Sequence, residues 1–280
     1  MKREVSVEKC ISTAGGNIYY QYISSFPGRP TVVLLHGLSS NHTTWNVIRE
    51  ELYIKGYNSL AVDLRGHARS DKRKVHRFYR WSTFTDDLHQ ILEQEQLERP
   101  ILVGYSYGGP IALNYAATYP NAVEAMVIIS TNYVNPLEYA RLGFLAPLCY
   151  CALQVAGWLL TWQRRKEYIY FQQEKSGGYL QSVWIGLNTM PLSINMWMLS
   201  QMFILNLKSV LPKISAATLV VRGEKDPFVS AAEMGDMVRL LPNGELQTTH
   251  YTGHFVASRA QHELSDLITN FTEAHEHRTL

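Results

Sequence analysis

Residues 104–108 have the sequence Gly104-Tyr105-Ser106-Tyr107-Gly108, in which a glycine lies two residues before and two residues after the serine. The apolar run 100–103 before it is typical of a strand, and the run 110–117 after it is compatible with a helix. A sharp turn from strand to helix forces its central residue toward positive φ, and it closes only where the residues two before and two after are nearly bare. The serine hydroxyl would then stand above the sheet, in front of a helix N-terminus. The pentapeptide therefore predicts a serine nucleophile.

Two residues far along the chain complete the chemistry that such a serine needs. A serine hydroxyl is a weak nucleophile until a neutral imidazole takes its proton, and a carboxylate must hold that imidazole in the right tautomer. Asp226 and His254 each follow a strand-like run, so the chain carries the order Ser…Asp…His. We predict Ser106, Asp226 and His254 as catalytic residues. Glu224 and His250, close by on the same two loops, are the alternatives.

Developing negative charge on a substrate oxygen also needs hydrogen-bond donors. The backbone N–H of Tyr107 stands at the start of the predicted helix, and the N–H of Leu38 lies in a loop after another strand-like run. We predict these two N–H groups as the oxyanion hole. His36, next to Gly37, is expected to brace this loop, and His67 to brace the rim of the site.

The elements that must position these residues alternate between strand and helix. Such alternation predicts a parallel sheet with helices on both faces, preceded by a hairpin. Ligands bind such sheets at the carboxyl ends of the strands, where the candidate residues are found. The hairpin covers residues 5–11 and 17–23; the strands are 31–35, 59–62, 101–103, 125–129, 217–221 and 245–249; the helices are 43–55, 83–97, the run after Ser106, 230–241 and a last one from about 258.

These motifs resemble the α/β-hydrolase superfamily, in its capped serine-hydrolase branch with a His-Gly-x-x oxyanion loop. Residues 63–70, Asp-Leu-Arg-Gly-His-Ala-Arg-Ser, are similar to that branch's Asp-x-Arg-Gly-x-Gly-x-Ser stretch, with Ala68 in place of the usual glycine. The resemblance places the acid at Asp226 and the base at His254. It implies an α/β fold with a mostly parallel central sheet, helices on both faces and a helical cap. The expected core is 1–130 and 213–280, and the cap (lid) insertion is 131–212.

The cap insertion contains an uncharged run from Leu142 to Trp162 that is long enough to span a bilayer. A single span would put Ser106 on one side of the membrane and Asp226 and His254 on the other, which a working triad excludes. We favour a buried cap packed over the active site, and a lid that touches lipid surfaces is the alternative. The basic stretch 72–80 would help such docking if it lies on the same face; Arg164-Arg165-Lys166 follows the run.

Tryptophan and methionine are concentrated in the same insertion. They either line a pocket for an apolar ligand or only hold the cap to the sheet. The residues are Trp158, Trp162, Trp184 and Trp197 with Met190, Met196, Met198 and Met202.

Composition narrows the classes of partner. The 280 residues have a formal net charge of +2, too near zero to suggest nucleic acid. The three cysteines form neither a disulfide framework nor a zinc motif, and no histidine–carboxylate group has metal-ligand spacing. We therefore expect no cofactor and no metal. The first nine residues lack the apolar core of a signal peptide, so a cytoplasmic location is expected, with peripheral membrane contact through the cap as the alternative.

The resemblance implies a hydrolase that cleaves carboxylic esters of apolar, uncharged substrates through an acyl-enzyme intermediate. Carbon–carbon bond hydrolases, thioesterases, peptidases and cofactor-free peroxidases of the same branch share fold and triad, and stay open. A small-molecule receptor with an intact triad is the alternative from another class. Serine at the elbow excludes the aspartate-based pattern of dehalogenases and epoxide hydrolases.

Overall fold

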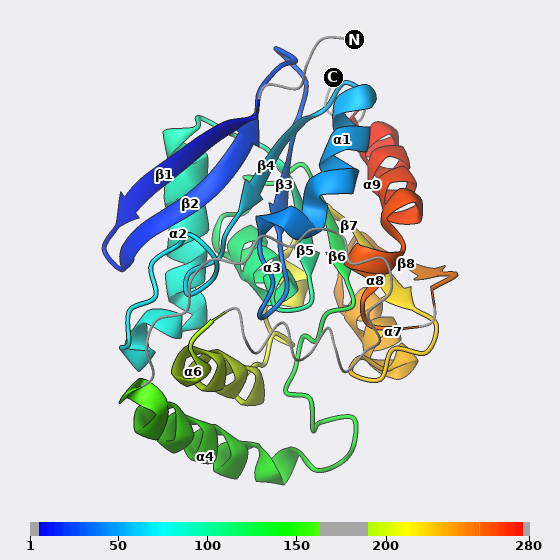
Figure 1. Cartoon of the computed structure of the whole chain (residues 1–280). Helices are drawn as coiled ribbons and strands as arrows, with labels where there is room; N and C mark the ends of the chain where they lie inside the picture. The colour runs from blue at the N-terminus through cyan, green and yellow to red at the C-terminus, as the bar shows by residue number, and fades with distance from the viewer. Residues whose placement is uncertain (1–5, 163–189, 252, 277–280) are drawn as a thin grey trace.

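A single eight-stranded sheet forms the centre of the protein (Figure 1). The computed structural model describes residues 6–162, 190–251 and 253–276. Trp184 and residues 164–166 lie outside the described residues. The strand order is β1-β2-β4-β3-β5-β6-β7-β8, and all neighbours are parallel except β1 with β2 and β2 with β4. The predicted mostly parallel sheet is confirmed.

The strands begin and end close to the predicted positions. The hairpin turns at Gly16, whose φ of 122° is open to glycine and unfavourable for other residues. The five central strands are buried at nearly every position, as expected for a sheet covered on both sides. The bounds are β1 Val7–Thr13, β2 Gly16–Ile23, β3 Thr31–Leu35, β4 Asn58–Val62, β5 Ile101–Tyr105, β6 Ala125–Ile129, β7 Ala217–Gly223 and β8 Gly244–Thr249.

Alternate residues of each central strand enter two separate cores. In β3, Val33 and Leu35 pack in one core, and Val32 and Leu34 pack in the other. Helices α2 (Trp81–Gln94), α3 (Gly108–Thr118) and α7 (Ala231–Leu240) cover the first face. Helices α1 (Asn46–Ile54), α8 (Val256–Arg259) and α9 (Gln261–Glu276) cover the second. Helices on both faces are therefore confirmed.

Two helices differ from the expectation in kind, and the predicted helix 83–97 is shifted to Trp81–Gln94 in α2. The predicted helix 43–55 begins as a 3-10 turn at His42–Trp45, because the Asn41 side chain accepts a hydrogen bond from the Thr43 N–H before α1 starts. The predicted last helix is two helices, α8 and α9, separated at Ala260. None of these differences moves a candidate site residue.

Between β6 and β7 the structure describes α4 (Ala146–Leu159) and α6 (Leu192–Phe203), which lie side by side at one end of the molecule (Figure 1). Helix α6 is largely buried, whereas α4 is not: of the residues around α4, Ala146 and Gly157 are buried and seven large apolar side chains are exposed. The expectation of a buried apolar run at 142–162 is therefore wrong. Among the described elements, α4 packs mainly on α6, and none of its stronger contacts is with a strand of the sheet.

Candidate active site

The turn between β5 and α3 has the geometry of a nucleophile elbow. Ser106 has a φ of 49°, which is rare for a residue with a Cβ atom. A Cβ atom added at Gly104 would lie 2.7 Å from the Gly109 Cα, and one added at Gly108 would lie 2.3 Å from the Leu35 carbonyl oxygen. Larger residues at either position would therefore push α3 away from β5 or β3. The two glycines let the helix start directly behind the serine.

The three predicted triad residues meet at this elbow. His254 Nε2 lies 3.0 Å from Ser106 Oγ, and His254 Nδ1 lies 2.8 Å from Asp226 Oδ2. Because the carboxylate can only accept, Nδ1 carries the imidazole proton and Nε2 is left free to accept the serine proton. The Tyr105 hydroxyl donates to the His254 carbonyl oxygen at 3.1 Å and so fixes the loop that carries His254.

The loop after β7 holds Asp226 as an ionised group. Its other oxygen accepts the N–H groups of Phe228 and Val229, at 2.9 and 3.2 Å. Burial raises the pKa of Asp226, but the hydrogen bonds from His254 and the Phe228 N–H outweigh this effect and hold the pKa below its ordinary value. The alternatives lie elsewhere: Glu224 and His250 are exposed, and neither contacts the Ser106–His254 pair.

The loop after β3 lies against Ser106. A Cβ atom added at Gly37 would be 3.2 Å from Ser106 Cβ, so the backbone passes directly beside the serine. Within the described residues, the N–H groups of Leu38 and Tyr107 donate no hydrogen bond. Helix α1 follows β3 onto one face of the sheet and α3 follows β5 onto the other. Open α/β sheets bind ligands where neighbouring strands send their connections to opposite faces.

Two buried histidines hold the loop after β3 through neutral rings. His36 Nε2 accepts the Leu64 N–H and His67 Nε2 accepts the Ser39 N–H, each at 3.0 Å. Burial lowers the pKa of His36 to about 4 and that of His67 well below its ordinary value. Both rings therefore keep a lone pair on Nε2 for these bonds near neutral pH. The expected bracing roles of His36 and His67 are observed as contacts.

Comparison with known proteins agrees with the fold. The family model described as the alpha/beta hydrolase fold matches residues 30–258. The chain belongs to the α/β-hydrolase fold family. The chain is 26% identical to an uncharacterized hydrolase of Bacillus subtilis over 95% of this chain and 98% of that protein. It is also 26% identical to an sn-1-specific diacylglycerol lipase of Mus musculus, over 86% of this chain and 80% of the lipase.

A solved esterase from Exiguobacterium antarcticum superposes with a TM-score of 0.74 at 20% identity, over 95% of this chain and 100% of the esterase. At that identity the likeness shows the fold alone. The chain spans about 40% of the length of the curated mycobacterial relatives that it matches at 30% identity over 141 residues.

In this α/β hydrolase, the stretch 63–70 is a brace for the site. Asp63 Oδ1 accepts hydrogen bonds from the backbone N–H and from the ring Nδ1–H of His42, each at 2.8 Å. Asp63 Oδ2 accepts a hydrogen bond from the backbone N–H of Arg69 at 3.2 Å. Ala68 has a φ of 38°, which explains why the resembling motif carries glycine there. The departure from the motif leaves the loop conformation intact, at the cost of a strained alanine.

Helix α6 reaches these same loops from the cap side. The Ser39 hydroxyl donates to Asn195 Oδ1 at 2.7 Å, and a Cβ atom added at Gly66 would lie 2.9 Å from an Ile194 methyl carbon. Trp197 is buried and stacks on Tyr79 at 6.2 Å between ring centroids. Met190, which is fully buried, and Trp197 therefore hold this part of the insertion to the core, while Trp158 and Trp162 are exposed.

Sequence reasoning missed the buried carboxyl of Glu233. It accepts hydrogen bonds from Asn132 Nδ2 at 3.1 and 3.0 Å and so ties α7 to the segment that leaves β6. The spacing Ser230-x-x-Glu233 is a helix N-cap signal that could have marked the position, and the Ser230 side chain does cap α7. Burial raises the pKa of Glu233 to about 7, with the Asp226 charge adding to the effect.

We expect Glu233→Gln to remove a pH dependence of stability. A carboxyl whose pKa is raised by folding stabilises the folded state below its unfolded pKa of about 4.3, and the contribution is lost as pH rises toward about 7. The free energy of unfolding of the wild type, relative to that of the variant, should fall by about 3 kcal/mol between pH 4 and pH 8. Urea unfolding of both proteins across that range measures it. Parallel stability curves for the two proteins would contradict the assignment.

Within the described ranges, no group of three or more histidine, cysteine, aspartate or glutamate side chains has the arrangement of a metal site. The absence of a cofactor and of a catalytic metal stays a prediction.

Proposed function

We propose that the protein is a serine hydrolase that cleaves carboxylic esters of apolar, uncharged substrates through an acyl-enzyme intermediate. The observation that carries the proposal is the continuous line Ser106–His254–Asp226, with contacts of 3.0 and 2.8 Å. A serine on a strained elbow, an imidazole with its proton on the far nitrogen and an ionised carboxylate form the set that activates a hydroxyl nucleophile.

The reaction follows from these positions. His254 Nε2 takes the proton of Ser106 as its Oγ attacks the ester carbonyl carbon. The N–H groups of Leu38 and Tyr107 bind the oxyanion, because the first lies in the loop beside Ser106 and the second at the start of α3. His254 then returns the proton to the leaving alcohol, and a water molecule activated by the same imidazole releases the acid.

The similarity to an sn-1-specific diacylglycerol lipase, over 86% of this chain, supports ester chemistry. The expected substrate preference rests on α6, which is uncharged, rich in apolar side chains and in contact with the loop beside Ser106. Thioester, amide and carbon–carbon bond cleavage use the same nucleophile, so substrate trials must separate them.

The test is active-site labelling followed by turnover. A fluorophosphonate probe should attach to the purified protein at Ser106, as read by peptide mass spectrometry. A series of chromogenic p-nitrophenyl esters with increasing acyl length should then show multiple turnover and a rise in kcat/KM with chain length. Labelling without multiple turnover of any ester, thioester, amide or carbon–carbon bond substrate would favour a ligand-binding receptor. Absence of labelling at Ser106 would end the proposal.

A further inference from the structure

Helix α4 presents a strongly apolar face to solvent. Along this helix and its two flanking turns, large apolar side chains face outward at spacings of three and four residues, which is one face of an α-helix. In a helix of a water-exposed surface, that face carries polar residues. The exposed fractions are Phe144 76%, Leu148 67%, Val155 56%, Trp158 69%, Leu159 58% and Trp162 77%.

The opposite face of α4 is fixed against α6 by small and polar residues. A Cβ atom added at Gly157 would lie 2.4 Å from Trp197 Nε1, so the helices meet closely at this point. The Gln154 amide donates to the Ser200 hydroxyl at 2.8 Å, and Trp197 Nε1 donates to the Gln154 carbonyl oxygen at 3.3 Å. Turning α4 by half a turn would bury the large side chains but break these contacts. Its packing therefore holds the apolar face outward.

Length and composition alone would let this segment cross a membrane. Gly143–Trp162 has 20 residues with a mean hydropathy of 1.6, and 11% of the apolar window is buried. Its position argues for a different arrangement, because α4 lies along α6, which is packed on the loops beside Ser106. A helix held flat against the folded domain can enter a lipid interface with one face but cannot span it without leaving α6.

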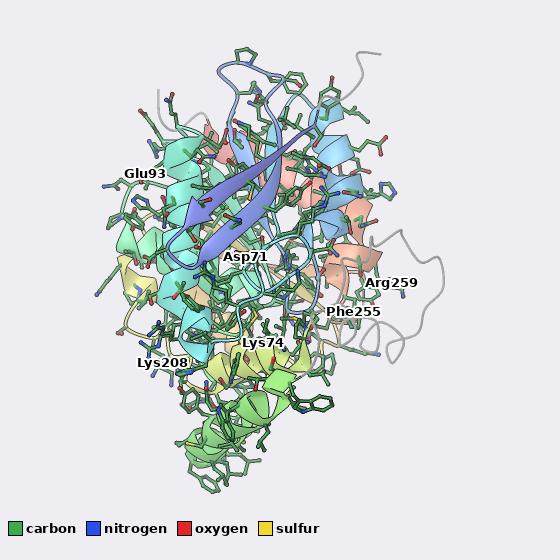
Figure 2. All side chains as sticks on the ribbon, turned by 60° about the vertical axis from the view of Figure 1, so that its left-hand side comes forward. Asp71, Lys74, Glu93, Lys208, Phe255 and Arg259 are labelled. Carbon is green, nitrogen blue, oxygen red and sulfur yellow. The ribbon has the colours of Figure 1, made fainter. Side chains whose placement is uncertain are left out.

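Positive charge lies next to the end of α4. Lys74 Nζ donates to the carbonyl oxygen of Thr161, so the basic stretch 72–80 touches this helix end, and Figure 2 shows Lys74 on the side of the cap helices. Arg73, Arg77 and Arg80 are exposed, and none of them forms an ion pair with a residue that the structure describes. The same region thus presents tryptophan, aliphatic and cationic groups, the combination with which proteins bind anionic lipid surfaces.

We propose that the outer face of α4, together with the basic stretch 72–80, docks on the surface of a bilayer that contains anionic lipids. The tryptophans Trp158 and Trp162 would enter the headgroup region, and the arginines would lie against the lipid phosphates. This proposal does not rest on ester hydrolysis, since it concerns a surface on the outer side of α6. If both proposals hold, docking brings α4 and the candidate active site close to a lipid surface that contains apolar esters.

Vesicle co-sedimentation of the wild-type protein tests the docking directly. The vesicles are made of ether-linked lipids, so that hydrolysis cannot change them: phosphatidylcholine alone, or phosphatidylcholine with phosphatidylglycerol. We expect binding to the phosphatidylglycerol vesicles, weaker binding to phosphatidylcholine alone, and weakening in 1 M salt, where the Debye length falls to about 3 Å.

Two matched variants distinguish binding through the outer face of α4 from nonspecific binding through any exposed apolar side chain. Trp158→Gln/Trp162→Gln should lower the partition coefficient by about tenfold or more, because two exposed apolar side chains no longer enter the lipid. Ile54→Gln is the control, since Ile54 is 72% exposed on α1, at the other end of the molecule (Figure 1). It should leave binding unchanged. All three proteins should show the same thermal unfolding midpoint, because the replaced side chains are exposed.

Three results would overturn the proposal. One is no binding of the wild type to either kind of vesicle. Another is an equal loss of binding in Ile54→Gln and in the double tryptophan variant. The third is a dimer by light scattering that the double tryptophan variant dissociates, since a second copy of the chain would then cover α4.

Discussion

Replacing Ser106 by alanine is expected to lower kcat for ester hydrolysis by about 10⁶-fold, because the only nucleophile in contact with His254 Nε2 among the described residues is removed. The fold should be retained, since the hydroxyl makes no other hydrogen bond there and alanine loses only one oxygen. The strained φ of 49° is demanded equally of serine and alanine. Steady-state kinetics on the preferred ester, with fluorophosphonate labelling of the same preparations, measures the effect.

Ser215→Ala is the matched control, because Ser215 is an exposed serine outside the site that bonds Asn121. It should keep wild-type turnover and labelling. Labelling of the Ser106→Ala protein at wild-type level would show that another residue is the nucleophile, and the proposed function would fall with it.

Asp226→Asn is expected to lower kcat by about 10⁴-fold with little change in KM. An asparagine amide facing His254 Nδ1 offers its own N–H, which favours the tautomer with the proton on Nε2. That nitrogen could then no longer accept the Ser106 proton. Because the variant keeps the size and the loop of Asp226, the loss reflects the proton position and not a broken site. Kinetics with the same ester as for the wild type gives the ratio.

Glu224→Gln supplies the control for the choice of acid. Glu224 precedes Asp226 by two residues on the same loop but is exposed and does not touch His254. Its replacement should change kcat less than twofold. A loss in Glu224→Gln as large as that in Asp226→Asn would mean that the loop rearranges and that the acid has been misassigned.

Most of the elements could be predicted from the sequence because their signals are local. Apolar runs flanked by turn residues mark β3, β5 and β6 within one or two residues, and the glycine spacing around Ser106 marks the elbow. The splitting of the last helix at Ala260 and the 3-10 start at His42 were not predicted. Such end effects depend on single hydrogen bonds, which periodicity does not report.

The residues of the candidate site could be predicted from the sequence. The contacts that hold their loops in place could not. Ser106, Asp226 and His254 were candidates by motif, and the structure brings them within hydrogen-bond distance. The contacts of Glu233 with Asn132 join segments about a hundred residues apart, so no pattern along the chain contains them. The same holds for the way in which His36 and His67 accept backbone N–H groups from opposite loops.

The sequence by itself determined the Gly-x-Ser-x-Gly turn, the order Ser106, Asp226, His254, the alternation of strand and helix and the uncharged character of α4. These are properties of neighbours along the chain. Only the tertiary structure decided which face of α4 points to solvent. Gly157 and Gln154 pack against Trp197 and Ser200 of α6, which lie more than 35 residues further along the chain. Periodicity could not foresee it, since α4 is apolar around nearly its whole circumference and its pattern favours no single face.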